Sequence, residues 1–170
     1  MENYAKYWPQ FYTATILEWK PLLSQDKYKE KIIESLQFLV ASKRITLYSF
    51  VIMSNHVHLI WQALIGNTPS KVQASFMKFT AKEIKLDLQK NHPLVLEKFK
   101  VNAADREYQF WERNPLGIEL YTNSVFMQKL EYIHLNPVNA GLCKFPEEYF
   151  YSSARFYQTG IDEFEILTHC

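Results

Sequence analysis

Hydrophobic and polar positions along the first part of the chain follow strand and helix periods in turn. Phe11–Leu17 is rich in β-branched and aromatic residues and alternates like a half-buried strand. Ile45–Met53 and His56–Gln62 predict two more strands, which Ser54 and Asn55 connect as a hairpin. Between the first strand and the hairpin, Lys27–Ser42 predicts a helix, because its apolar residues recur at helical spacing: Tyr28, Ile32, Leu36, Leu39 and Val40.

A long helix is predicted after the hairpin. It runs from Ser70 to about Asn91, with Thr68 as N-cap and Pro69 at the first helical position. Four lysines fall on one narrow face of this helix, and such a basic ridge could follow a nucleic-acid backbone. An ordinary solvated helix face explains the same pattern equally well. The four lysines are Lys71, Lys78, Lys82 and Lys85.

The rest of the chain predicts further strands and a last helix. Tyr108–Trp111 and Ile118–Tyr121 indicate one or two strands, separated by a breaker at residues 114–117. Ser124–Asn136 has helical spacing, with Thr122 or Asn123 as its cap. Pro137 is expected to end this helix near Asn136, because a residue before proline disfavours helical geometry.

Length and composition indicate one packed domain over residues 1–170, with 48% hydrophobic and only four glycine residues. Cys143 and Cys170 are too few for a disulfide framework and are expected to be reduced. Residues 1–6 lack the pattern of a secretory signal, and no apolar run is long enough to span a bilayer. We therefore expect a soluble protein of the cytoplasm that does not bind membranes.

Two histidines one residue apart lie inside the apolar run of the predicted third strand. His56 and His58 point to the same face, while Val57 and Leu59 point to the other. Two core histidines satisfied by backbone groups are the simpler explanation of this spacing. However, two neighbouring buried imidazoles must each find a partner, and a metal ion satisfies both at once.

Tyr132 and Asn136 lie one above the other on the predicted last helix, four residues apart. A tyrosine on such a helix most often packs in the core. If the helix lies against the strand of His56 and His58, however, the two imidazoles and the Asn136 carbonyl oxygen can bind a metal beside the Tyr132 hydroxyl. Nitrogen and neutral oxygen ligands with open coordination positions suit a catalytic divalent ion.

These residues resemble the motifs of one family. His56-Val57-His58 is similar to the HUH motif (histidine, hydrophobic residue, histidine), and residues 132–142 resemble the signature around the nucleophile of single-tyrosine HUH transposases. The branch resembled is that of the REP-associated tyrosine transposases, in the IS200-like superfamily. Segments 52–55, 110–113 and 151–155 extend the resemblance over essentially the whole chain. Ser54, where many relatives have proline, and the formal net charge of +1 depart from the family pattern.

The resemblance implies an α+β fold, a ferredoxin-like or RRM-like sandwich whose antiparallel central sheet carries the HUH motif on a central strand. It implies that His56, His58 and Asn136 bind Mg²⁺ or Mn²⁺, and that Tyr132 attacks DNA. The family acts on single-stranded DNA with REP-like hairpins in the bacterial cytoplasm, through a 5′-phosphotyrosine intermediate. Its REP-associated branch favours a monomer, with a tyrosine-swapping homodimer as the alternative.

Two other functions remain compatible with the sequence. A domesticated relative would bind a nucleic-acid hairpin without cutting it, and a metal hydrolase would use the histidine pair to activate water. The hydrolase is less favoured, because no carboxylate near His56 and His58 is placed as a general base. Trp111 is a further candidate DNA contact, since it could stack on an unpaired base, although a core position fits it as well.

Overall fold

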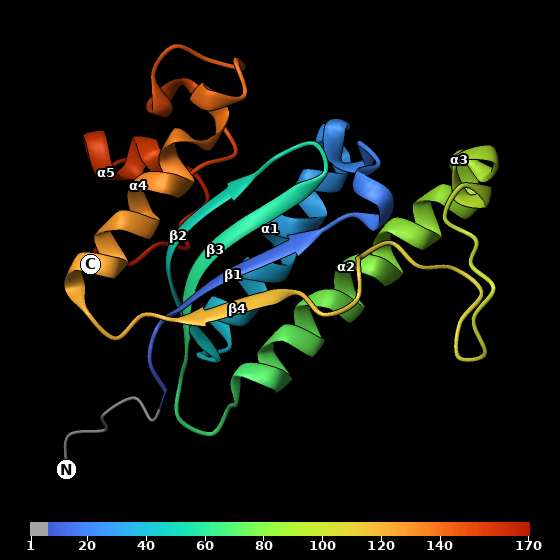
Figure 1. Cartoon of the computed structure of the whole chain (residues 1–170), viewed down its shortest axis with the longest axis horizontal. Helices are drawn as coiled ribbons and strands as arrows, with labels where there is room; N and C mark the ends of the chain where they lie inside the picture. Colours follow the sequence, from blue (N-terminus) through green and yellow to red (C-terminus); the bar gives the residue numbers. More distant parts are fainter. Residues whose placement is uncertain (1–6) are drawn as a thin grey trace.

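The computed structural model describes residues 7–170 (Figure 1). Residues 1–6, on which the expected lack of a secretory signal rests, lie outside the described part. Four strands form one antiparallel sheet in the order β2-β3-β1-β4. Their bounds are Gln10–Thr15 for β1, Ile45–Ile52 for β2, His56–Ala63 for β3 and Leu116–Glu119 for β4.

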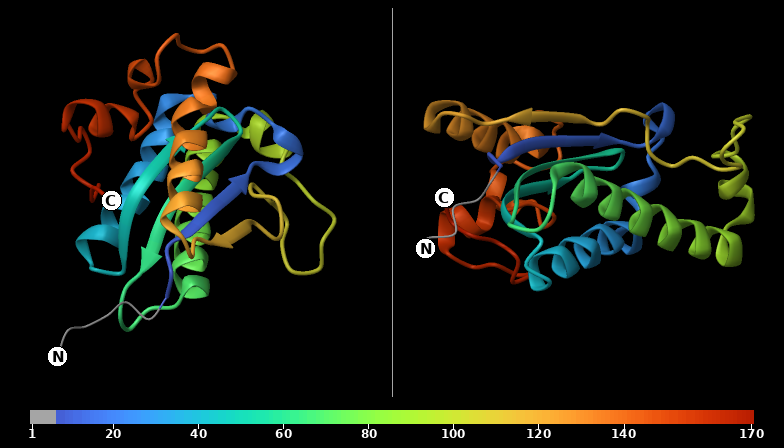
Figure 2. Two further views of the ribbon diagram at one scale, coloured as in Figure 1. Left: turned by 60° about the vertical axis from the view of Figure 1, so that its left-hand side comes forward. Right: turned by 90° about the horizontal axis from the view of Figure 1, so that it is seen from below.

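Helices cover both faces of this sheet, with α1 and α2 on one face and α4 on the other (Figure 2). The order β1-α1-β2-β3-α2-β4 is that of a ferredoxin-like fold, so the predicted α+β class and the central position of β3 are confirmed. The α-helices are α1 (Asp26–Ala41), α2 (Pro69–Asn91), α3 (Pro93–Glu97), α4 (Asn123–Asn139) and α5 (Ala154–Thr159). Short 3₁₀ turns occur at Leu17–Trp19, Leu22–Ser24 and Pro146–Glu148.

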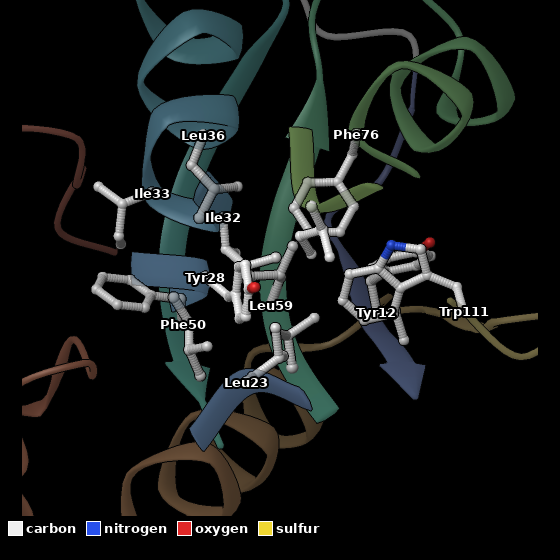
Figure 3. Packing of buried hydrophobic residues seen from close by; sticks show 14 of the residues in the cluster. Tyr12, Leu23, Tyr28, Ile32, Ile33, Leu36, Phe50, Leu59, Phe76 and Trp111 are labelled. Carbon is white, nitrogen blue, oxygen red and sulfur yellow. The ribbon is translucent and has the colours of Figure 1, made fainter. Parts of the chain in front are cut away.

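The larger core fills the space between the sheet and helices α1 and α2 (Figure 3). Tyr12 and Leu59 face this layer from the central strands, while Ile32 and Phe76 face them from the helices. Each fully buried side chain of this size contributes about 1.5–3 kcal/mol to folding. Because strand residues alternate, the next positions along β1 and β3 point to the opposite face, toward α4.

Of the one or two strands predicted between residues 108 and 121, the structure forms one, β4, and its bounds differ from the prediction. Residues 108–111 form isolated bridges rather than a strand. Phe110 and Trp111 are buried because their side chains pack in the core, and not because their backbone pairs with another strand. Strand β4 starts at Leu116, inside the predicted breaker, since Pro115 precedes the ladder and removes no donor from it.

Helix α4 continues one turn beyond its predicted end. Pro137 is buried inside the helix, and the carbonyl of Asn136 still accepts a hydrogen bond from the Ala140 N–H at 3.0 Å. Pro137 lacks only its own backbone N–H donor. The carbonyl groups of Asn136 and Pro137 can still accept hydrogen bonds from later residues, so the helix completes a last turn. Thr122 caps the start of α4 by accepting from the Val125 N–H at 3.2 Å, as one of the two predicted caps.

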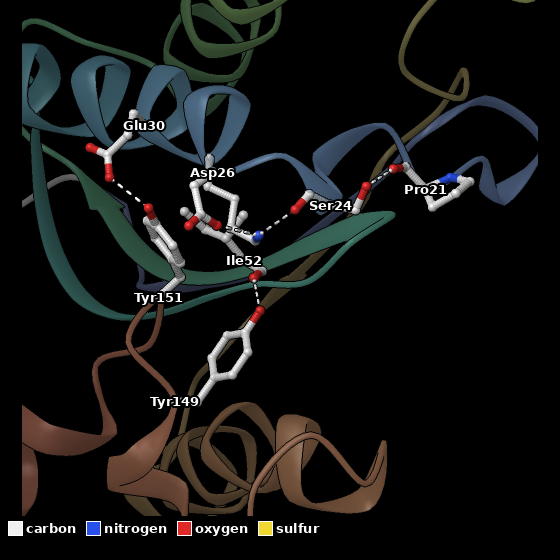
Figure 4. Close-up of polar contacts among 8 residues, drawn as sticks. Pro21, Ser24, Asp26, Glu30, Ile52, Tyr149 and Tyr151 are labelled. Atoms are coloured by element: carbon white, nitrogen blue, oxygen red, sulfur yellow. Dashed lines mark hydrogen bonds and ion pairs between the residues drawn. The ribbon is translucent and has the colours of Figure 1, made fainter.

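The C-terminal segment lies along the outer edge of β2. The Ile52 N–H donates to the Tyr151 carbonyl at 2.9 Å, and the Ser153 N–H donates to the Phe50 carbonyl at 2.9 Å. Figure 4 shows two tyrosine hydroxyls that fix this segment: Tyr149 donates to the Ile52 carbonyl at 2.8 Å, and Tyr151 donates to Glu30 at 2.7 Å. Sequence periodicity did not predict this packing. No helix among residues 7–170 has the length and apolar character needed to cross a bilayer.

Candidate metal and nucleophile site

The two histidines lie on the face of β3 that α4 covers. Their ring centroids are 4.8 Å apart at an interplanar angle of 70°. Phe11 of the neighbouring strand β1 stacks on His58, with 5.3 Å between centroids and 20° between planes. Val57 and Leu59 belong to the core on the opposite face, so the predicted orientation of the pair is confirmed.

Hydrogen bonds at Nδ1 orient both imidazoles. His56 Nδ1 donates to Asn55 Oδ1 at 2.7 Å, and His58 Nδ1 lies 2.7 Å from Thr13 Oγ1. Thr13 pairs with His58 in the β1-β3 register. With Nδ1–H donating to each oxygen, Nε2 of each ring keeps its lone pair, as histidine ligands of metal ions require.

Burial keeps both rings neutral. Desolvation lowers the pKa of His58 to about 3, and the nearby charges of His56 and Lys129 add to this effect. Burial also lowers the pKa of His56, against a hydrogen bond with Asn136 that raises it. A neutral imidazole is the form that binds a metal. The pair is therefore ready to accept a cation at neutral pH.

Helix α4 brings Tyr132 and Asn136 to the histidine pair. The Asn136 side chain lies close enough to His56 to act on the pKa of that imidazole. The Tyr132 ring lies 5.3 Å from the His58 ring at 70°, and 6.0 Å from the Phe11 ring. Tyr132 is 48% exposed, so part of this residue is open to solvent. Four side chains from two distant segments thus converge at one point.

His134 anchors α4 from the side facing β2, a role that the sequence did not suggest. Its Nε2 lies 2.8 Å from Ser153 Oγ and 3.4 Å from Ser49 Oγ. Ile133 is fully buried between α4 and the sheet. These contacts fix the helix within the same chain, and they set the positions of Tyr132 and Asn136.

Lys129 is a further residue that sequence reasoning missed. Its Nζ lies 4.9 Å from the Phe11 ring centroid and 5.7 Å from the Tyr132 ring centroid. The residue precedes Tyr132 by three positions on α4, a spacing that could have indicated a shared helix face. Lys129 therefore adds a positive charge beside the nucleophile candidate.

The donor set at this point is two imidazoles and a carboxamide. No group of three His, Cys, Asp or Glu side chains among residues 7–170 is placed to hold a metal, so a site here depends on the Asn136 amide as third ligand. Neutral donors of this kind, with orienting hydrogen bonds at both rings, fit a divalent ion that keeps open positions for substrate.

The candidate DNA contacts divide into two groups. Lys78, Lys82 and Lys85 line a groove of about 560 Å³, together with Arg106 and Arg113. Lys71 is exposed nearer the start of α2 and does not line it.

Of the two positions that the sequence left open for Trp111, the structure has the one in the core. Trp111 is only 5% exposed, packs on Phe76 and donates its indole N–H to Thr80 at 3.0 Å, so it belongs to the core (Figure 3).

The fold and the histidine pair on β3 agree with the resemblance to HUH transposases. The family model described as "Transposase IS200 like" matches residues 15–112, more than half of the chain. The chain therefore belongs to the IS200-like transposase family. The match includes His56 and His58 and ends before α4, so Tyr132 and Asn136 enter the site through the geometry alone. No curated protein sequence matches the chain.

Two solved structures share the fold. A REP-associated tyrosine transposase bound to a REP hairpin superposes with a TM-score of 0.66 and 16% identity, over 97% of this chain and 90% of that one. A candidate transposase from Deinococcus radiodurans R1 gives a TM-score of 0.52 and 10% identity, over 78% of this chain and 93% of that one. At these identities the two likenesses establish the fold, and the predicted resemblance to REP-associated transposases is confirmed at that level.

Proposed function

We propose that the protein is a single-domain transposase that cleaves and rejoins single-stranded DNA through Tyr132. The observation that carries this proposal is the convergence of Tyr132 and Asn136 from α4 with His56 and His58 from β3. A core tyrosine would be buried, whereas Tyr132 lies beside two neutral, oriented imidazoles and remains half-exposed. This combination suits a nucleophile better than a packing residue.

In the proposed reaction the Tyr132 oxygen attacks a backbone phosphorus and releases its proton to solvent. The bond between phosphorus and the 3′ oxygen breaks, and the released 3′ oxygen takes up a proton. The 5′ phosphate stays on Tyr132 as a phosphotyrosine ester. Because one phosphodiester is exchanged for another, rejoining by a 3′-hydroxyl needs no nucleotide cofactor. The Lys129 ammonium group stabilises negative charge that develops at the phosphate.

His56, His58 and Asn136 would hold Mg²⁺ or Mn²⁺ at this site. Bound there, the ion would supply Lewis acid chemistry to a phosphate oxygen and would orient the substrate. The Asn55 amide oxygen, which only accepts, keeps His56 in the ligating tautomer, and Thr13 Oγ1 is placed to accept from Nδ1 of His58 in the same way.

The groove along α2 suits the paired part of the substrate. Lys78, Lys82 and Lys85 gather there, beside Arg106 and Arg113, which both pair with Asp105, although the whole chain has a net charge of only +1. Local clustering of cations decides phosphate binding more than net charge does. The solved relative bound to a REP hairpin supports a hairpin-bearing, REP-like DNA as the substrate.

A covalent adduct tests the proposal. The purified protein is incubated with hairpin oligonucleotides that carry unpaired flanks, with Mg²⁺ or Mn²⁺, and is analysed on a denaturing gel. We expect a protein-DNA adduct that is lost in Tyr132→Phe, in His58→Ala and on addition of a chelator. Tyr121→Phe is the matched control, because Tyr121 is also exposed but lies before α4, away from the histidines.

Cleavage that persists in Tyr132→Phe would contradict the assignment of the nucleophile. Binding of hairpins without any adduct, across a panel of different flanks, would favour the alternative function of a domesticated module that holds a hairpin without cutting it.

A further inference from the structure

We propose that Trp19 is a stacking site for an unpaired base of the DNA strand that enters the Tyr132 site. Trp19 is 61% exposed, whereas Trp61 and Trp111 are buried in the core. Its ring meets the His56 ring edge-on, with 5.9 Å between centroids and 66° between planes. The proposal rests on the proposed function, since it places a base next to the phosphate that Tyr132 would attack.

The backbone that presents Trp19 is held in an uncommon conformation. Glu18 and Trp19 have φ of 54° and 56°, in the left-handed region that non-glycine residues rarely adopt. The turn persists because the Trp19 N–H donates to the Ile16 carbonyl at 2.9 Å and the Glu18 N–H donates to Glu112 Oε1 at 2.6 Å. Strain of this kind collects at ligand contacts, and here it directs a large apolar ring into solvent.

Asn55 couples this turn to the first histidine. Its Oδ1 accepts from His56 Nδ1 at 2.7 Å, and its Nδ2 donates to the Trp19 carbonyl at 3.3 Å. One side chain therefore fixes both the imidazole and the turn that carries the indole. A base stacked on Trp19 would belong to a nucleotide whose phosphate lies close to His56.

The charges around Trp19 favour a base over a phosphate as the bound group. The Glu18 carboxylate is mostly exposed, and Glu112 lies beside it at the same turn. These two acidic groups keep the phosphates of a passing strand away from the turn itself, while the indole face binds a base by stacking. Lys20 forms an ion pair with Glu18 at 2.7 Å, so its charge is already occupied.

The position of the turn also suits a strand that passes from the groove to the site. Glu112 lines the groove of Lys78, Lys82 and Lys85, and its carboxylate holds the Trp19 turn. In Figure 1 this turn follows the end of β1 and lies beside the β2-β3 connection. An unpaired strand leaving a hairpin in the groove would cross Trp19 before it reached Tyr132.

Binding measurements test this site without requiring cleavage. All proteins carry Tyr132→Phe, and the probe is a fluorescent hairpin oligonucleotide with an unpaired flank on each side. We expect Trp19→Ala to weaken binding by about 5- to 150-fold, the effect of losing one stacked base, and Trp19→Phe to retain most of the affinity. A blunt hairpin should bind both variants equally.

Trp8→Ala is the matched control, because Trp8 is 52% exposed but precedes β1, at the other end of that strand from Trp19. Quenching of tryptophan fluorescence by the flanked hairpin, lost in Trp19→Phe, is a second measurement on folded protein. Unchanged binding in Trp19→Ala, or an equal loss with the blunt hairpin, overturns the stacking site. If the unmodified protein forms no adduct although Trp19→Ala weakens binding, the nucleophile is refuted and the stacking site stands.

Discussion

Thr13 and Asn55 connect the histidine pair to the rest of the sheet. Each places one side-chain oxygen at hydrogen-bond distance from the Nδ1 atom of a histidine. Together the two contacts fix the orientation of the imidazoles, and so determine which ring nitrogen faces α4. Residues that orient metal ligands in this way affect metal affinity nearly as much as some ligands do. Thr13 reaches His58 because β1 and β3 are neighbours in the sheet.

Thr13→Val should weaken metal binding while preserving the fold. Valine has the same shape but cannot accept from His58 Nδ1, so the ring loses its fixed tautomer. We expect the Mn²⁺ concentration that half-saturates adduct formation to rise by about 10- to 100-fold. Thr13→Ser keeps the hydroxyl and should stay close to the unmodified protein. Equal metal dependence in Thr13→Val and the unmodified protein would rule out this orienting role.

Local sequence patterns were sufficient to predict the candidate metal ligands but not the residues that orient them. Strand alternation predicted the shared face of His56 and His58, and helical spacing predicted the stacking of Tyr132 over Asn136. The role of Thr13 depends on the order of strands in the sheet, which no local pattern contains. Trp111 was ambiguous because a buried aromatic and an exposed one look alike in a single sequence, and only the packing against Phe76 decides between them.

At the scale of elements, α4 is the part that completes the site. Its apolar face packs on the sheet through Phe126, Leu130 and Ile133, and His134 adds a polar anchor to Ser153. The same Ser153 hydroxyl lies 2.9 Å from Ser49 Oγ and accepts a hydrogen bond from the Phe50 N–H at 3.0 Å. Helix, strand and C-terminal segment thus meet at one fully buried hydroxyl.

Ser153→Ala should destabilise the protein by about 1–3 kcal/mol, because it leaves His134 and the Phe50 N–H without this partner in a buried position. Urea unfolding monitored by circular dichroism measures the change. Ser42→Ala removes an exposed hydroxyl and should change the free energy of unfolding by less than about 0.5 kcal/mol. A Ser153→Ala protein as stable as Ser42→Ala would show that the anchor contributes nothing.

For the whole molecule, the packing of α4 on its own sheet predicts that one chain contains a complete site. Mixing Tyr132→Phe with His58→Ala should therefore produce no more adduct than the two variants give separately. A dimer that exchanges its tyrosine helices would rebuild an intact site in such a mixture. Adduct restored by mixing would contradict a site formed within a single chain.

Buried tyrosines predict a loss of stability in alkaline solution. Burial raises the pKa of Tyr149 to about 12, and burial also raises the pKa of Tyr12, Tyr28, Tyr151 and Tyr157. In the unfolded chain these groups lose their protons near about pH 10, so above that pH the unfolded state binds fewer protons than the folded state. The contribution of these neutral tyrosines to the free energy of unfolding is fully present below about pH 10 and falls as the pH rises toward 12.

Urea unfolding at several pH values from 8 to about 11 measures this slope, which is at most about 1.4 kcal/mol per pH unit for each tyrosine. Tyr149→Phe should give a shallower slope, whatever its stability at pH 8. A free energy of unfolding that is constant across this range would contradict the prediction.

The C-terminal segment along β2 has a consequence for how separate molecules behave. An outer strand with free N–H and carbonyl groups can pair with the same strand of another molecule and start aggregation. Residues 151–153 occupy part of that edge, and the Thr168 N–H adds a hydrogen bond to the Leu47 carbonyl at 2.9 Å. At the opposite edge β4 is only four residues long. The segment that fixes the tyrosine helix thus also covers part of the sheet edge at which a second copy of the chain could pair.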